Sequence, residues 1–123
     1  MAQRLILTAD DNAQIRMLVK AALRSLGHEL IEAVDGEQAL ETAIERKPDL
    51  ILLDVTMPKL DGWEVLGFLR KRPETAGVRV MMLTTAAQKD DLAHGEELGC
   101  NDYLVKPFSP GDLRQHVERM LDT

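Results

Sequence analysis

Short apolar runs alternate with amphipathic stretches along the whole chain, and this alternation restricts the possible folds more than any other feature of the sequence. Five of the apolar runs have the length and composition of β-strands. Most of them are almost continuously apolar rather than alternating, which is the pattern of strands covered on both faces. The predicted strands span residues 4–9, 28–34, 49–54, 78–84 and 100–105.

The stretches that follow these strands have the period of amphipathic helices. Gly27 ends the first helix as a C-cap, and the second helix stops before Pro48. The third opens at Asp61, a weaker fourth is closed by Gly99, and Ser109, followed by proline, begins the fifth. The chain therefore repeats a strand–helix unit five times.

Repeated strand–helix units require right-handed crossovers, and so a parallel sheet with helices on both faces. We therefore expect an α/β protein whose five strands form a doubly wound sheet in the flavodoxin-like order 2-1-3-4-5. The 123 residues fit one domain. We expect a single domain over residues 1–123, without an output domain after the last helix.

Composition argues against several classes of function. The formal charge of −6 disfavours a nucleic-acid partner, because phosphate contacts need clustered Lys and Arg side chains. No apolar run approaches the ~20 residues of a membrane span, and the N-terminus lacks the features of a signal peptide. The single cysteine, Cys100, suits a reducing compartment. We expect a cytoplasmic protein with no membrane partner.

The carboxyl ends of the predicted strands point to a functional site. In a sheet of this order, ligands bind where the first and third strands end. The residues that end the first, third, fourth and fifth strands combine three carboxylates, a hydroxyl and an ammonium group: Asp10, Asp11, Asp54, Thr84 and Lys106.

Three carboxylates in one crevice need charge compensation. Two unit charges ~4 Å apart repel by about 4 kcal/mol at an effective dielectric near 20. Either one carboxylate stays protonated or a cation joins them. Ligands that are all oxygen, at an open site, suit Mg²⁺ with several waters retained. The lysine supplies a further positive charge, whose partner is expected to be a phosphate or another anion.

This arrangement favours phosphoryl transfer to Asp54. A carboxylate can act as the nucleophile and form an acyl phosphate, and positioning with charge neutralisation is most of what the transfer requires. The hydroxyl of Thr84 would then bond to a phosphoryl oxygen. Each residue also has an ordinary interpretation: Lys106 as a surface lysine, Thr84 as a β-branched strand residue, and Asp10 or Asp11 as the cap of the first helix. Their convergence at one sheet edge favours the site.

Four motifs together resemble those of response-regulator receiver domains in two-component signalling, in the single-domain form of the chemotaxis regulators. They are ADDN (9–12), LLDVTMPKLDG (52–62), LTT (83–85) and DYLVKPF (102–108), and they follow the order and elements of that family. The resemblance implies that Asp54 is the phosphoacceptor. It also implies that Asp10 and Asp11, with Asp54 and the backbone carbonyl of Thr56, hold Mg²⁺.

The same resemblance assigns roles to the last two strands. Lys106 is expected to bind the phosphoryl group, and the peptide before Pro107 is expected to be cis. Thr84 and Tyr103 match the switch pair of the family, in which the hydroxyl moves toward the phosphate and the aromatic ring turns inward. The implied product is a phosphoprotein, a regulator that assists its own phosphorylation and dephosphorylation without being a turnover enzyme.

The resemblance also suggests the partners. The phosphodonor would be a sensor histidine kinase or a histidine phosphotransfer protein. A downstream target protein would bind the face formed by the fourth helix, fifth strand and fifth helix. His116 and Glu118 stand where one receiver dimer has arginines, so we expect a monomer or a weak dimer. A receiver excised from a larger regulator or a hybrid kinase would have the same sequence pattern.

Two other classes of protein are less consistent with the sequence. A haloacid-dehalogenase-like phosphatase also uses an aspartyl nucleophile at a strand end, but it has a second acid two residues later, where this chain has Thr56. A nucleotide-binding or flavin-binding domain would be expected to show a G-x-G-x-x-G or P-loop sequence, and neither occurs.

Overall fold

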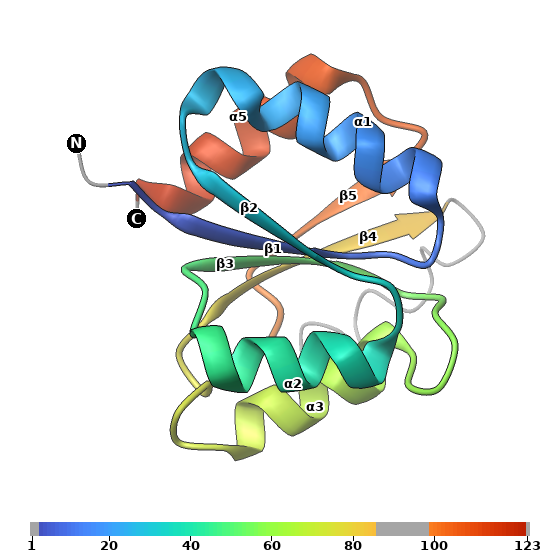
Figure 1. Ribbon diagram of the computed structural model, residues 1–123, viewed down its shortest axis with the longest axis vertical. Coiled ribbons are helices and arrows are strands. Elements are labelled where there is room, and N and C mark those ends of the chain that lie inside the picture. The colour runs from blue at the N-terminus through green and yellow to red at the C-terminus, as the bar shows by residue number, and fades with distance from the viewer. Residues whose placement is uncertain (1–2, 86–98, 123) are drawn as a thin grey trace.

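The computed structural model describes residues 3–85 and 99–122. It shows one five-stranded parallel sheet between two layers of helices (Figure 1). The strand order is β2-β1-β3-β4-β5, which confirms the predicted flavodoxin-like topology. The strands are β1 (Leu5–Ala9), β2 (Glu29–Ala33), β3 (Leu50–Asp54), β4 (Arg79–Thr85) and β5 (Asp102–Lys106).

Helices cover both faces of the sheet. Figure 1 shows α1 and α5 on one face and α2 and α3 on the other. The predicted fourth helix, which would end before Gly99, lies outside the described residues. Within the part of the chain that the structure describes, no helix combines the length and hydropathy needed to cross a membrane. The helices are α1 (Ala13–Leu23), the short 3₁₀ helix η1 (Arg24–Leu26), α2 (Gly36–Arg46), α3 (Gly62–Lys71) and α5 (Pro110–Leu121).

The helices begin largely where the sequence predicts. Asp61 and Ser109 cap α3 and α5, and each forms a capping box with the residue three positions later. The alternative interpretation, in which Asp10 or Asp11 caps the first helix, is wrong. Asn12 caps α1 instead, because its side chain accepts hydrogen bonds from the first N–H groups of the helix. The aspartates are thereby free for other contacts.

Burial of β3 on both faces explains its uninterrupted apolar sequence. All five of its residues are buried. Ile51 and Leu53 belong to the core cluster under α2 and α3, whereas Leu50 and Leu52 belong to the cluster under α1 and α5. The strand therefore ends in a rigid, fully packed setting that fixes the position of Asp54. The edge strand β2 is less covered, since two of its residues are exposed.

Gly62 brings the start of α3 directly onto the end of β3. Its N–H donates to the Val55 carbonyl at 2.8 Å. A Cβ atom at this position would overlap the backbone carbonyl oxygen of Asp54 and crowd the Val55 Cα atom. The absence of a side chain therefore allows the loop after Asp54 to close back against the strand.

Candidate functional site

Four of the predicted site residues meet at the carboxyl ends of the strands. The Lys106 Nζ atom lies 3.0 Å from Asp54 Oδ1 and 3.1 Å from Asp10 Oδ2. Asp10 is fully buried and Asp54 is 6% exposed. One ammonium group from β5 thus bridges carboxylates that follow β1 and end β3, as the strand-end rule predicts.

The third carboxylate completes an acidic cluster. Asp10, Asp11 and Asp54 each offer one carboxylate oxygen, and these oxygens lie within 4.8 Å of one another. Asp11 is exposed, so the cluster is open to solvent on one side. A hard divalent cation such as Mg²⁺ fits this donor set, because it prefers oxygen ligands and keeps several waters at an open site.

The electrostatics of the site favour added positive charge. Burial raises the pKa of the Asp54 carboxyl, and the negative charges of Asp10 and Asp11 act in the same direction. The hydrogen bond from Lys106 opposes this shift without cancelling it. Burial also acts to lower the pKa of Lys106, but its contacts with Asp54 and Asp10 outweigh burial and raise that pKa overall. The lysine therefore stays protonated between two acids.

We expect Asp54→Asn to stabilise the metal-free protein by about 1 kcal/mol at pH 7, because the fold disfavours the ionised carboxylate. The folded-state pKa of Asp54 is raised from its usual value of 3.8. Between the pKa of Asp54 in the unfolded chain and its higher pKa in the folded protein, the native state binds more protons than the unfolded chain. The wild type therefore loses stability as pH rises from the first of these pKa values to the second. The Asn variant avoids this loss, and its advantage should disappear below about pH 4.

Urea unfolding of both proteins without divalent ions, at neutral pH and near pH 4, measures this difference. A variant that is less stable than the wild type at pH 7 would show that the contact with Lys106 outweighs the burial of the charge.

The remaining predicted site residues are the switch pair, Thr84 and Tyr103, and the loop residue Thr56. The Thr84 hydroxyl is buried and donates to the Thr85 carbonyl at 2.9 Å. Tyr103 is 38% exposed on β5. Thr56 is exposed in the loop after β3. The peptide bond between Lys106 and Pro107 is cis, as the resemblance implies.

A mostly apolar cleft adjoins the lysine. It has a volume of about 340 Å³ and lies between α1 and the segment after β5. The site therefore opens next to an apolar surface on the side of α1. The cleft is lined by Ile15, Leu18, Thr85, Lys106, Pro107 and Phe108.

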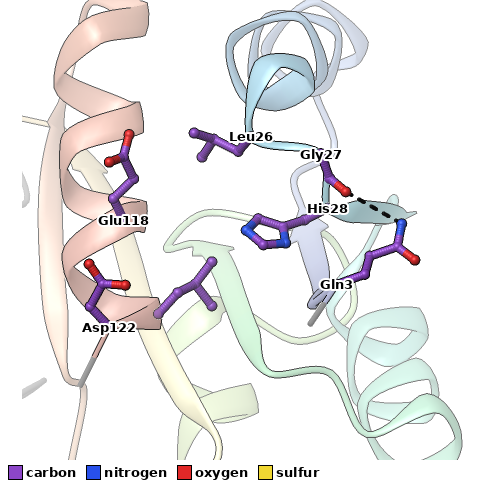
Figure 2. A pocket seen from close by; sticks show the side chains of 7 residues that line it. Gln3, Leu26, Gly27, His28, Glu118 and Asp122 are labelled. Carbon is purple, nitrogen blue, oxygen red and sulfur yellow. Dashed lines mark hydrogen bonds between the residues drawn. The ribbon is translucent and has the colours of Figure 1, made fainter. Parts of the chain in front are cut away.

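A second pocket lies at the other end of the sheet, before the first residues of β1 and β2. It has a volume of about 280 Å³. Figure 2 shows Glu118 of α5 and Asp122, which follows this helix, on one side of it and His28 on the other. His28 Nδ1 accepts a hydrogen bond from the Arg4 N–H at 3.0 Å. None of the site residues predicted from the sequence lines this pocket, so it is separate from the acidic cluster.

Arg16 was not predicted as part of the site. Its Nη1 atom donates to the Asp10 carbonyl oxygen at 2.7 Å, and its Nε atom donates to Glu32 Oε1 at 3.1 Å. One sequence signal could have indicated it. A cation near the start of a helix is opposed by the helix dipole, so Arg16 near the beginning of α1 calls for a local negative partner.

Comparison with known proteins identifies the family. A family model described as "Response regulator receiver domain" matches residues 6–118. The "Probable transcriptional regulator ycf27" of Porphyridium aerugineum is 41% identical over 98% of this chain and 49% of its own length. The chain spans about half the length of the curated relatives it matches.

Solved structures agree with this match. A putative response regulator from Chloroflexus aurantiacus has a TM-score of 0.93 and 32% identity, covering 99% of this chain and 100% of its own. The receiver domain of a sensor histidine kinase from Pseudomonas aeruginosa has a TM-score of 0.89 and 33% identity, covering 99% of this chain and 100% of its own. That structure has a magnesium ion coordinated in its active-site cleft. The four motifs and the fold are thus those of one family, and the chain belongs to the response regulator receiver domains.

Proposed function

We propose that this domain is a phosphorylation-dependent signalling switch in which Asp54 accepts a phosphoryl group from a histidine kinase or a phosphotransfer protein. One observation carries the proposal. Lys106 Nζ bridges Asp54 and Asp10 at 3.0 and 3.1 Å, beside the open carboxylate of Asp11. This is the charge arrangement that an incoming phosphoryl group requires.

The residues of the chain have distinct tasks in the transfer. An oxygen of the Asp54 carboxylate attacks phosphorus, the new O–P bond forms, and the P–N bond to the donor imidazole breaks with its electron pair going to nitrogen. Asp10, Asp11, Asp54 and the Thr56 carbonyl would hold Mg²⁺, which when bound would neutralise charge on the phosphoryl oxygens. Lys106, already bonded to Asp54, pairs with the phosphoryl group as negative charge moves onto it.

The response to phosphorylation would begin at Thr84. Its hydroxyl, which donates to the Thr85 carbonyl here, turns to a phosphoryl oxygen, and the exposed ring of Tyr103 turns inward. Phosphorylation then shifts a pre-existing equilibrium between two arrangements rather than creating a new one. A downstream protein reads the change at the surface that includes β5 and α5.

The described part of that surface supports a monomer or a weak dimer. His116 Nδ1 lies 2.8 Å from Asp102 Oδ2, and Arg119 lies 3.6 Å from the same carboxylate oxygen. His116 is therefore half-buried in a contact within the chain. The Asp102 carboxylate already has two side-chain partners in its own chain, which leaves it less available to a second copy.

The cleft beside Lys106 and the net charge of the chain are consistent with a protein phosphodonor as the partner. The cleft beside Lys106 would receive the phosphohistidine-bearing protein, since Lys106, which bonds to Asp54, forms part of its lining. The charge of −6 disfavours nucleic acid as a partner of these 123 residues. The relatives named as transcriptional regulators are about twice as long, and their names describe the longer proteins. We place the domain in the cytoplasm, with its kinase, as a regulator rather than a turnover enzyme.

Incubation with a small phosphodonor such as acetyl phosphate tests the function. We expect intact mass spectrometry to show one added phosphoryl group in the wild type with Mg²⁺, little without Mg²⁺, and none in Asp54→Asn. Asp61→Asn, which changes an acid at the N-cap of α3, is the matched control and should still be phosphorylated. Equal incorporation in wild type and Asp54→Asn would disprove the assignment.

A further inference from the structure

The peptide bond between Asp10 and Asp11 is held from outside the acidic cluster. Arg16 donates from Nη1 to the Asp10 carbonyl oxygen at 2.7 Å, the oxygen of that peptide unit. The same guanidinium donates from Nε to Glu32 on the edge strand β2. The Arg16 side chain is only 16% exposed, so it fills the space between α1, β2 and the loop after β1.

Asp10 itself is fixed by several contacts. Its N–H donates to the Ala33 carbonyl at 3.1 Å, and its Oδ1 accepts from the Asn12 N–H at 2.9 Å. Its Oδ2 accepts from Lys106. Arg16 holds the remaining polar atom, the carbonyl oxygen. Asp10 would therefore keep its place without Arg16, and the contact must matter for the next residue in the chain, Asp11.

Asp11 depends on the backbone for its direction. Its side chain is exposed and makes no hydrogen bond or ion pair with the described residues. Its carboxylate nevertheless lies within 4.8 Å of those of Asp10 and Asp54. Rotation of the Asp10–Asp11 peptide would swing this carboxylate away from the cluster, and Arg16 is the side chain that bonds the oxygen of that peptide.

We propose that Arg16 is a positioning residue for the divalent-cation site, acting through the Asp10–Asp11 peptide to aim Asp11 at Asp54. The proposal rests on the proposed function and specifies how the metal-free protein prepares its metal site. Glu32 is the anchor, because it bonds Arg16 with one oxygen and Lys20 with the other. The hydrogen bond from Lys20 lowers the pKa of Glu32, so this anchor stays ionised.

The direction of the change in Mg²⁺ affinity on replacing Arg16 distinguishes a positioning role from the effect of its charge. Arg16 is a cation near a cation site, so its charge alone weakens Mg²⁺ binding, and removing it would strengthen binding. The loss of positioning predicts the opposite result. Lys20 provides the matched control, because it pairs with the same Glu32 from the same helix but makes no contact with Asp10.

Isothermal titration of the metal-free proteins with MgCl₂ tests the proposal. We expect the Kd for Mg²⁺ to rise about tenfold in Arg16→Met, as for other residues that orient metal ligands. Lys20→Met should stay within about twofold of the wild type, as expected for loss of an exposed ion pair. Arg16→Lys keeps a hydrogen-bond donor and the charge, so its Kd for Mg²⁺ should lie between those of the wild type and Arg16→Met. This variant replaces Arg16→Met in the test if the Met variant does not fold.

Two further measurements distinguish failure of the positioning role of Arg16 from failure of the proposed function. Amide exchange at Asn12, whose N–H donates to Asp10 Oδ1 just beyond the Asp10–Asp11 peptide, should be faster in metal-free Arg16→Met than in metal-free Lys20→Met. Saturating Mg²⁺ should restore the rate at which acetyl phosphate phosphorylates the Arg16 variants. Equal or tighter Mg²⁺ binding by Arg16→Met and Arg16→Lys would overturn the role of Arg16 and leave the proposed function intact. A wild type that binds no Mg²⁺ would overturn both.

Discussion

Lys106→Met is expected to lower the free energy of unfolding of the metal-free protein by about 3 kcal/mol at pH 7, because removing one partner of a buried ion pair leaves an uncompensated charge. The Lys106 side chain is 18% exposed and lies between two nearly buried carboxylates, Asp10 and Asp54. Without the ammonium group these acids repel each other, together with Asp11. Urea unfolding followed by circular dichroism measures the loss.

Three comparisons identify the cause of this loss. Added Mg²⁺ should reduce the deficit, because a cation replaces part of the missing charge. Lower pH should also reduce it, since the already raised pKa of Asp54 rises further when Lys106 is removed and protonation relieves the repulsion. Lys20→Met removes an exposed ion pair with Glu32 and should cost less than about 1 kcal/mol. A deficit that is equal at all pH values would point to lost packing instead.

Arg70→Met is expected to cost about 2–3 kcal/mol of unfolding free energy through lost hydrogen bonds alone. Its guanidinium donates twice to the Gly99 carbonyl, at 3.0 and 2.7 Å, and also to the carbonyls of Val78 and Ala76. A fifth bond reaches Asn101 Oδ1 at 2.9 Å. One side chain of α3 therefore ties together the segments that lead into β4 and β5.

Arg72→Met is the matched control for this variant. Arg72 lies just after α3 and pairs only with the exposed Glu74 among the side chains of the described residues. Its replacement should change the unfolding free energy by less than about 0.5 kcal/mol. Equal losses in the two variants would show that the carbonyl contacts of Arg70 contribute little. Because these contacts lie at the amino ends of β4 and β5, folded Arg70→Met should bind Mg²⁺ as the wild type does.

The sequence predicted the sheet and the core of the site because both depend on simple patterns. The apolar run that ends at Asp54 indicated a strand buried on both faces, and β3 is buried throughout. The parallel topology then placed the strand ends together without knowledge of any side-chain conformation. The meeting of Asp54 with Lys106, 52 positions apart in sequence, is a consequence of that topology alone.

Contacts chosen by local geometry could not be predicted in the same way. Asn12 and the preceding aspartates are all good N-cap residues, and only the backbone path after β1 decides that Asn12 caps α1. The bond from Arg16 to the Asp10 carbonyl depends on a side chain reaching back over one helical turn. The pairing of His116 with Asp102 joins two elements whose relative register is set by packing. Sequence patterns carry no direct information on such contacts.

A crystal structure of the protein with Mg²⁺ and beryllium fluoride, which mimics a phosphoryl group, is the most direct test of the proposed phosphoacceptor site. We expect beryllium bonded to an Asp54 carboxylate oxygen, Mg²⁺ in contact with the carboxylates of Asp11 and Asp54, and Lys106 Nζ bonded to fluoride. Beryllium fluoride on any other side chain, or Mg²⁺ bound away from these two carboxylates, would contradict the assignment.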